Sequence, residues 1–227
     1  MATLYIIGTP IGNLGDLSPR AAEILKTAGL VASEDTRQTL KLLNHLGIKA
    51  KMVSCRAQNE RFAAEKVLSA LAEGRDAAYT SDAGTPCLSD PGAVLVRMVS
   101  EAGYPVLPVP GPSAFAALVS IAGGMDKTVV FEGFLSPKAG KRRSRLAELL
   151  ERHEAFVLYE SPFRVLKLLD DLADLDGERY ICVGREMTKF HEEYLRGRAS
   201  ELRDRLAVRG DQKGEFSVYV SGKKAQI

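Results

Sequence analysis

The sequence predicts an α/β protein with a mostly parallel N-terminal sheet and a mixed C-terminal sheet. Through the first half of the chain, short apolar runs alternate with helical segments, which is typical of a parallel sheet covered on both faces. In the second half the expected strands are short and follow one another like hairpins. Gly123-Gly124 separates the two patterns and is the expected hinge, giving domains 1–123 and 124–227.

The strands expected in the N-terminal half are apolar, as strands buried on both faces are. They are Leu4–Gly8, Leu30–Ser33, Lys51–Ser54, Asp76–Thr80 and Pro105–Pro108. Helices are expected over 19–28, 35–46, 59–73, 93–102 and 114–122. Three of them begin at typical capping residues: Ser18 before a proline, Asp35 with Gln38 as a capping box, and Asn59.

The C-terminal half also alternates, with shorter connections. Strands are expected at Thr128–Glu132, Ala155–Tyr159, Tyr180–Gly184, Glu192–Arg196 and Glu215–Ser221. Helices are expected from the basic run after Pro137 to about His153, from Ser161-Pro162 to about Leu175, and after a Ser200 cap.

Composition excludes several classes of protein. With 31 basic and 29 acidic residues in 227, the net charge is +2, so an anionic partner must be met by a local patch. The three cysteines and three histidines are scattered, which predicts no metal site and suits a reducing cytoplasm. No apolar run reaches the ~18 residues of a membrane span, so no membrane association is expected.

The loop Ser81–Gly92 has two glycines, two prolines and two aspartates, and it follows a predicted strand. Glycine lets a backbone approach a ligand closely, and proline holds a turn in one shape. Open α/β sheets bind ligands at the carboxyl ends of their strands, so this loop is a candidate binding loop. An ordinary rigid turn, with Asp82 or Asp90 as a cap, is an equal alternative.

The common nucleotide-binding motifs are absent: no Gly-x-Gly-x-x-Gly follows the first strand, and no Walker lysine motif occurs. Turns rich in glycine, proline and serine instead follow three expected strands, at Gly8–Asn13, Ser81–Gly92 and Pro110–Ser113. Such turns would surround a small ligand with backbone N–H and C=O groups rather than hold a phosphate at one helix.

Seven stretches along nearly the whole chain, in this order, carry a resemblance to a known family. They are Leu4–Leu14, Ser33–Arg37, Ser81–Pro86, Pro110–Ala114, Glu132–Leu135, Tyr159–Ser161 and Arg185–Lys189. Together they resemble the tetrapyrrole methylase superfamily of S-adenosylmethionine-dependent methyltransferases. More narrowly, they are similar to its bacterial branch of small-subunit ribosomal RNA (cytidine-2′-O)-methyltransferases.

The resemblance implies two α/β domains with S-adenosyl-L-methionine in the cleft between them, usually in a homodimer. It also implies a reaction, methylation of a cytidine 2′-hydroxyl in the decoding region of small-subunit (16S) rRNA. Two departures bear on RNA contacts. Relatives often carry histidines where this chain has Arg56 and Gln58, and they often continue into a helical C-terminal extension beyond the position of Ile227.

Cofactor contacts are expected on the three turns. Asp82 is the first candidate, with turn capping as its alternative, and Ser113 is equally suited to cap the helix that follows it. The full set, mostly implied by the resemblance, is Pro10, Ile11, Asp82, Gly84, Thr85, Pro86, Gly111, Ser113 and Ala114.

Three residues are candidates for the base that assists attack by a ribose hydroxyl, which is a weak nucleophile. Glu186 and Lys189 share a charged loop after an expected strand, and Glu160 ends another strand. A desolvated lysine acts as a base when its pKa falls. A salt bridge is the favoured alternative for Glu186.

Five basic residues within eight positions are the expected RNA phosphate site, although a solvated helix start is the usual role of such runs. They are Lys138, Lys141, Arg142, Arg143 and Arg145. Asp35, Arg37 and Arg185 are further candidates for substrate contact, with helix capping the alternative for Asp35. Phe134, Phe163 and Phe190 are each able to stack a base, although core packing is the favoured alternative.

The expected function is therefore methylation of the small ribosomal subunit RNA. A small-molecule methyltransferase of the tetrapyrrole type is one alternative, and it would not need the basic run as a patch. A non-catalytic RNA-binding assembly factor is another, and stoichiometric cofactor binding without turnover would favour it.

Overall fold

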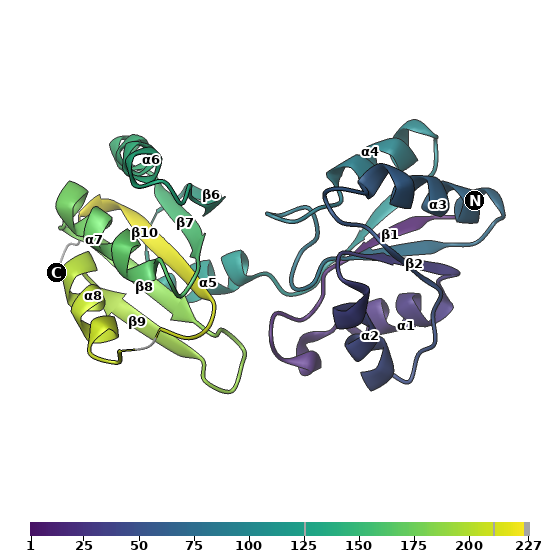
Figure 1. Ribbon diagram of the computed structural model, residues 1–227, viewed down its shortest axis with the longest axis horizontal. Coiled ribbons are helices and arrows are strands. Elements are labelled where there is room, and N and C mark those ends of the chain that lie inside the picture. The colour runs from purple at the N-terminus through teal and green to yellow at the C-terminus, as the bar shows by residue number, and fades with distance from the viewer. Residues whose placement is uncertain (125, 211, 225–227) are drawn as a thin grey trace. The chain divides into compact units, whose positions relative to one another are not determined.

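The computed structural model describes residues 1–124, 126–210 and 212–224, and side chains through Gly222 at the C-terminal end. The chain forms two compact units, Met1–Ser113 and Ala114–Ile227, each with its own sheet (Figure 1). The α/β class and the parallel and mixed character of the two sheets are confirmed.

The boundary between the units precedes helix α5 (Ala114–Ala122), whereas the hinge was expected after it, at Gly123-Gly124. Helix α5 packs on strands of the second sheet, and its Leu118 side chain lies against Gly184. Tyr180 also donates its hydroxyl to the carbonyl of Ala122 at 2.7 Å. These contacts attach the helix to the second unit.

The first unit holds a parallel five-stranded sheet in the order β3-β2-β4-β1-β5. The strands are β1 (Leu4–Ile7), β2 (Leu30–Ser33), β3 (Met52–Ser54), β4 (Ala77–Thr80) and β5 (Val106–Val109). Strands β1 and β4 are neighbours, but the chain leaves β1 toward β2 and leaves β4 toward β5, in opposite directions across the sheet. Such a switch point is where open α/β sheets hold ligands.

Helices cover both faces of this sheet (Figure 1). They are α1 (Pro19–Thr27), α2 (Thr36–His45), α3 (Glu60–Ala72) and α4 (Ala93–Glu101), with a short 3-10 turn η1 (Leu14–Asp16). The packing of β1 explains why its sequence is continuously apolar. Leu4 packs with α3 and α4 on one face of the sheet, whereas Ile7 packs with α1 and α2 on the other. Successive side chains of a strand point to opposite faces, so both faces are buried here.

Two expected helix starts have different capping contacts. Ser18 caps α1 as predicted, since its Oγ accepts the N–H of Ala21 at 3.1 Å. Asp35 caps α2, but the predicted capping box does not form because Gln38 accepts instead from Lys41. Asn59 precedes α3 without capping it, because its side chain is turned back to the N–H of Arg56 and the carbonyl of Ser54.

The second unit holds a mixed sheet in the order β6-β7-β10-β8-β9. The strands are β6 (Val129–Phe134), β7 (Ala155–Glu160), β8 (Arg179–Arg185), β9 (Glu193–Gly197) and β10 (Phe216–Lys224). Only β6 and β7 pair in parallel; β10 is antiparallel to both β7 and β8, and β9 is antiparallel to β8.

Three helices contribute to the main core of this unit: α6 (Ala139–Glu151), α7 (Val165–Asp176) and α8 (Ala199–Ala207). Helix α7 begins at Val165 rather than at the predicted Ser161-Pro162, because a turn comes first. Helix α8 begins after Arg198 rather than after Ser200, and Glu201 accepts the backbone N–H of Arg198 at 3.1 Å.

Candidate cofactor and acceptor site

The three glycine- and proline-rich turns of the first unit meet at the carboxyl ends of β1, β4 and β5. Thr9 and Gly84 form an isolated antiparallel bridge, with N–H···O distances of 2.9 and 3.0 Å. Thr85 donates its hydroxyl to the carbonyl of Pro112 at 3.4 Å. The turns that the sequence places up to about a hundred residues apart are thus linked to one another directly.

Glycine is required where two of these turns touch. A Cβ atom on Gly8 would lie 2.8 Å from the amide nitrogen of Gly111, and one on Gly111 would lie 2.4 Å from the carbonyl oxygen of Gly8. Neither residue has room for a side chain. The surface there is consequently made of backbone groups, as expected for turns that surround a small ligand.

The central loop Ser81–Gly92 is held in an unusual conformation. Cys87 and Ser89 both have φ of 66°, a left-handed backbone that side-chain-bearing residues rarely adopt. Gly92 has φ of 123° and lies against Tyr79, whose hydroxyl donates to the carbonyl of Pro91 at 2.7 Å. The loop is thus fastened to the strand that precedes it.

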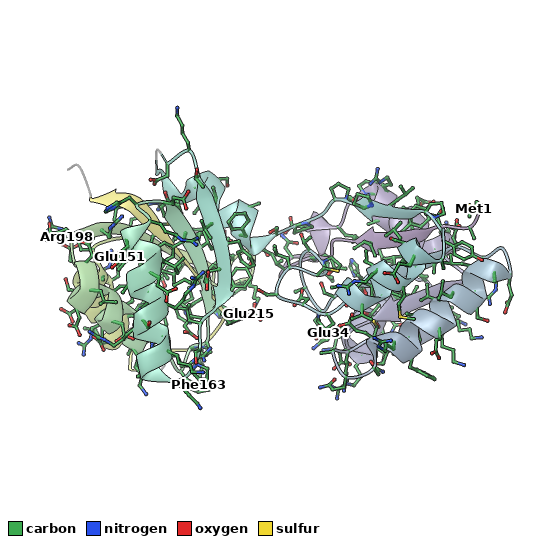
Figure 2. The ribbon with its side chains drawn as sticks, turned by 90° about the horizontal axis from the view of Figure 1, so that it is seen from above. Met1, Glu34, Glu151, Phe163, Arg198 and Glu215 are labelled. Carbon is green, nitrogen blue, oxygen red and sulfur yellow. The ribbon has the colours of Figure 1, made fainter. Side chains whose placement is uncertain are left out.

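A polar pocket of about 350 Å³ lies beside this loop, where β2 and β4 end. It is lined by Glu34, Asp35, Arg37, Arg56, Ala57, Gln58, Asp82 and Pro91. Carboxylates and guanidinium groups therefore share one cavity. Figure 2 shows Glu34 in the first unit, away from Met1 at its far end.

Hydrogen bonds fix the walls of this pocket. Asp82 accepts the backbone N–H of Asp35 through Oδ1 at 2.9 Å, and Arg56 donates to the carbonyl of Glu34 at 3.3 Å. Asp35 also pairs with Arg37 at 2.5 Å, and the Arg37 side chain is 81% exposed. Arg37 is hence anchored at one edge and open to a ligand at the other.

The carboxylates around the pocket differ in proton affinity. Burial, repulsion from Glu34 and repulsion from Asp82 raise the pKa of Asp90 to about 6, against a hydrogen bond from Ser81. Burial is also the main cause that raises the pKa of Glu34. Hydrogen bonds from Arg37 hold the pKa of Asp35 well below its usual range. Perturbed carboxylates in a cavity are a feature of functional sites.

The sequence analysis did not select Glu34 and named Arg56 only as a departure from relatives. Glu34 directly follows strand β2, one position nearer to its strand end than Asp82 is to the end of β4. The end of every strand in the parallel sheet was therefore a usable signal.

The expected cofactor residues divide between the units. Pro10, Ile11, Gly84, Thr85 and Gly111 lie on the linked turns of the first unit, with Ile11 in contact range of the Gly84 backbone. Pro86 is buried in the central loop, and Ser113 ends the unit. Ala114 begins α5 and so belongs to the second unit. The Asp82 carboxylate is already bound to the Asp35 amide, which gives it a part in fixing the loops.

The proposed base Lys189 lies in a network of opposite charge. Its Nζ is 2.8 Å from Glu186 and 3.1 Å from Glu215, and Glu186 also accepts the Glu215 amide at 2.9 Å. Burial lowers the pKa of Lys189, but the bonds to Glu186 and Glu215 outweigh it and leave the pKa raised. Burial likewise raises the pKa of Glu186, and the bonds from Lys189 and Glu215 outweigh that effect and lower it. Both groups are therefore held charged, which is the opposite of the depressed pKa expected for a lysine base.

Glu160 is also engaged. It is 3% exposed, 2.7 Å from the guanidinium of Arg164, and it accepts the N–H of Ser161. Arg185 donates to the carbonyl of Lys213 at 2.8 Å and lies 3.8 Å from Glu193. These contacts hold loops of the second unit together.

The basic run is not one solvated patch. Arg142 is 5% exposed and pairs with the buried Asp171 at 2.6 Å, so it cannot serve as a phosphate contact on the surface. Arg143 pairs with Asp171 and Asp174, and Arg145 pairs with Glu132 and Glu148. The sequence did not predict these ion pairs, because the acidic partners come from α7, from β6 and from a later turn of α6 itself. Lys138 and Lys141 remain exposed.

The comparisons with known proteins agree with this geometry. A family model described as Tetrapyrrole (Corrin/Porphyrin) Methylases matches residues 3–203. The chain belongs to the tetrapyrrole methylase family. Solved structures of the family's architecture include a cobalt-precorrin-4 methyltransferase, 18% identical with a TM-score of 0.70 over 96% of this chain and 94% of that one. A uroporphyrin-III-C-methyltransferase from Thermus thermophilus is 16% identical, with a TM-score of 0.66 over 98% of this chain and 95% of that one.

Among tetrapyrrole methylase relatives, several share the name Ribosomal RNA small subunit methyltransferase I. The one from Borrelia garinii is 47% identical over 96% of this chain and 98% of its own length. The one from Xylella fastidiosa (strain Temecula1) is 45% identical over 97% of this chain and 81% of its own length. The one from Pseudomonas aeruginosa is 43% identical over 98% of this chain and 80% of its own length.

No helix within the described part of the chain is both long and apolar enough to cross a membrane.

Proposed function

We propose that this chain is an S-adenosylmethionine-dependent methyltransferase that methylates the 2′-hydroxyl of a cytidine in the decoding region of small-subunit rRNA. The observation that carries the proposal is the 47% identity, over nearly the full length of both chains, to a relative named Ribosomal RNA small subunit methyltransferase I. Methyl transfer follows from the family, and the nucleotide and its 2′-oxygen are the finer part of the proposal.

The linked turns of the first unit suit the cofactor. S-adenosylmethionine supplies an activated methyl group on a cationic sulfonium. The close approach of Gly8 and Gly111 leaves backbone N–H and C=O groups to bind its polar ends. The carboxylates of Asp82 and Asp90 give this side of the unit the negative charge that a cation favours. Pro10, Ile11, Gly84, Thr85, Pro86, Ser113 and Ala114 complete the proposed set.

The polar pocket suits the ribose and phosphate of the acceptor nucleotide. Arg37 and Arg56 would bind phosphate oxygens, because guanidinium groups match the geometry of such anions. Glu34 lines the same pocket with a raised pKa, which makes it a better proton acceptor than an ordinary surface carboxylate. We therefore propose Glu34 as the group that accepts the proton of the 2′-hydroxyl.

The sequence candidates for this role, Glu186, Lys189 and Glu160, stay predictions, and their ion pairs favour a role in fixing loops. Homodimer formation and a cytoplasmic location accompany the proposed activity. The proposal also keeps two domains, with the boundary moved to Ser113/Ala114 to agree with the packing of α5. Sedimentation velocity on the purified chain tests the dimer.

The decisive experiment is tritium transfer from labelled S-adenosylmethionine to small ribosomal subunits that lack the modification, followed by nucleoside analysis. We expect label in 2′-O-methylcytidine. Label in another nucleoside would overturn the proposed acceptor. Cofactor binding with no label in RNA would favour a small-molecule acceptor or a non-catalytic assembly factor.

A further inference from the structure

One edge of the second sheet gathers the ends of three parallel strands. Strands β7 and β8 are both antiparallel to β10, so they run parallel to each other and to β6. The register puts their last residues in two adjacent rows: Phe134 is paired with Tyr159, and the next row joins Glu160, Phe216 and Arg185. We call this border, with the loops that leave it, the carboxyl edge.

Three exposed phenylalanines lie on the carboxyl edge. Phe134 ends β6 and is 58% exposed, Phe163 follows β7 and is 87% exposed, and Phe190 lies between β8 and β9 and is 96% exposed. Only one other phenylalanine among the described residues is exposed, Phe62 in the first unit. Core packing, the favoured alternative from the sequence, is therefore wrong for all three, and their shared position requires an explanation.

The loops that carry two of these rings are fixed rather than free. The loop before Phe190 has positive φ at Glu186 (50°) and Thr188 (64°), and Glu186 donates its N–H to the carbonyl of Glu215 at 2.9 Å. Thr188 donates its N–H to Glu192 at 2.7 Å. At Phe163, the carbonyl of Ser161 accepts the N–H groups of both following residues, Arg164 and Val165. Both rings are thus presented on ordered turns.

The loops that carry the rings also hold charged residues. Lys189 pairs with Glu186, Arg185 with Glu193, and Glu160 with Arg164. The core of a protein–protein interface is depleted of charge, so exposed rings separated by ion pairs are a poor match for a protein partner. Such rings suit unpaired bases, which stack on aromatic faces while their phosphates stay near cations.

Two exposed lysines follow Phe134 in the chain. Lys138 and Lys141 are exposed at the start of α6, which follows β6 and Phe134. Within the described part of the chain, no carboxylate lies within ion-pair distance of either ammonium group. Figure 2 shows Phe163 and Glu215 on the side of the unit away from Glu151 and Arg198, which mark the opposite border.

We propose that the carboxyl edge is a stacking platform for an unpaired segment of the RNA substrate, with Phe163 and Phe190 as its principal rings and Phe134 as a third. The proposal rests on the proposed function, because RNA is the substrate there. The attachment points span three strand spacings of about 4.8 Å, or about 14 Å from β6 to β8, which is room for more than one splayed base. The segment bound is single-stranded, because a duplex keeps its base faces stacked internally.

The direct test uses the absence of tryptophan from the chain. Phe163→Trp and Phe190→Trp each introduce a single tryptophan on the carboxyl edge, which is excited selectively at 295 nm or above, and Phe62→Trp is the matched control on the first unit. Each variant is titrated with single-stranded oligocytidine RNA and with a blunt-ended RNA duplex of the same length. We expect the single strand to quench the fluorescence at the first two positions and not at the control, and we expect the duplex to quench none of the three. Equal quenching at all three positions, or none at either edge position, would overturn the proposal.

A second measurement separates this proposal from the proposed function. The variant with Phe163→Ala and Phe190→Ala should raise the KM for small subunits about tenfold or more per ring, with cofactor affinity and melting temperature unchanged. Phe62→Ala should leave KM unchanged. Normal KM in the double variant would overturn the platform while rRNA methylation stands.

Failure of the wild-type chain to methylate RNA would overturn the proposed function, whatever the fluorescence shows. Loss of a dimer in the double variant would assign the rings to contact between copies and also overturn the platform.

Discussion

The Oδ1 atom of Asp82 accepts a hydrogen bond from the backbone N–H of Asp35 at 2.9 Å. This bond joins the loop after β4 to the end of β2, and so links the turns proposed for the cofactor with the pocket proposed for the acceptor. The backbone N–H of Asp82 in turn faces the Glu34 carboxylate at 3.4 Å. One residue thereby influences both binding regions.

Substitutions at Asp82 should separate its charge from its hydrogen bond. Asp82→Asn keeps an acceptor for the Asp35 amide but removes the charge, whereas Asp82→Ala removes both. We expect calorimetry to show weaker S-adenosylmethionine binding in both variants, with the larger loss, about tenfold, in Asp82→Ala, because a lost hydrogen bond to a charged group costs about 1.5–3 kcal/mol. Equal affinity in wild type and Asp82→Ala would contradict this assignment.

Glu34→Gln should lower kcat by a factor of about 10²–10⁴ and leave cofactor affinity nearly intact, as expected for loss of a general base. Glu186→Gln is the comparison, since it breaks the ion pair with Lys189 without touching the pocket. Single-turnover methylation of small subunits measures both. A severe kcat loss in Glu186→Gln at normal KM, with Glu34→Gln active, would return the role to the loop after β8.

The raised pKa of Asp90 predicts a specific dependence of stability on pH. Because its pKa rises from about 3.8 to about 6 on folding, the folded state binds this proton more tightly than the unfolded chain does. That contribution is complete below pH 3.8 and is lost as pH rises through 6. Asp90→Asn should therefore gain stability relative to wild type as pH rises between these values, in urea melts taken at several pH values.

Asp35→Asn should give a different profile. The pKa of Asp35 is lowered by Arg37, so its stabilising contribution is present above its ordinary pKa and is lost only as pH falls below it. The variant should be less stable than wild type by a constant amount between about pH 5 and 7.5, well above the reference pKa of about 3.9. Parallel profiles for the two variants would contradict the assignment of opposite shifts.

Arg142→Met should destabilise the protein by about 3 kcal/mol. Removing one member of a buried ion pair costs about 3–5 kcal/mol, and the lower end applies because Arg143 still reaches Asp171. That remaining contact is 2.8 Å. Lys141→Met, at the neighbouring but exposed position of α6, should change the free energy of unfolding by no more than about 0.5 kcal/mol. Urea unfolding measures both.

RNA binding should respond in the reverse order. The variant with Lys138→Ala and Lys141→Ala should reduce the slope of log K against log salt by about 1.4 for a single strand, since each phosphate contact contributes about 0.7. Arg142→Met should leave that slope unchanged at temperatures where it is folded. A reduced slope in Arg142→Met alone would show that the guanidinium reaches phosphate after all.

Gly8→Ala should damage both stability and cofactor binding, because its Cβ would lie 2.8 Å from the amide nitrogen of Gly111. Gly140→Ala is the matched control: no atom lies within 4 Å of its added Cβ, and the residue is in helix α6. Alanine there should be neutral or stabilise by up to about 1 kcal/mol. Thermal melts with and without S-adenosylmethionine measure the two effects together.

The sequence predicted those features that depend on neighbouring residues. The order of strands and helices and the Ser18 cap follow from local patterns, and the sheet classes follow from the spacing of elements. Features set by tertiary partners were missed. The Arg142–Asp171 pair joins residues 29 positions apart, and the sequence around Arg142 does not indicate a buried acidic partner.

Exposure was misjudged for a related reason. A phenylalanine near a strand end has the composition of a core residue, and only the register of β6, β7 and β8 reveals that three such rings lie on one border. Likewise Gln38 has the right spacing for a capping box, but Lys41 competes for its side chain. Glu34 directly follows β2 in the sequence, but the raised pKa that distinguishes it comes mainly from its burial in the folded protein.

The position of β10 has a consequence for synthesis of the chain. The first unit has all its strands by Val109, so it is able to fold while the rest is being translated. The second unit cannot complete its sheet until the end of translation, because β10 begins at Phe216 and lies at the centre of that sheet, between β7 and β8. Until then two apolar strands, β7 and β8, present unpaired edges that invite aggregation. A nascent chain stalled before Phe216 should therefore be half folded and dependent on chaperones.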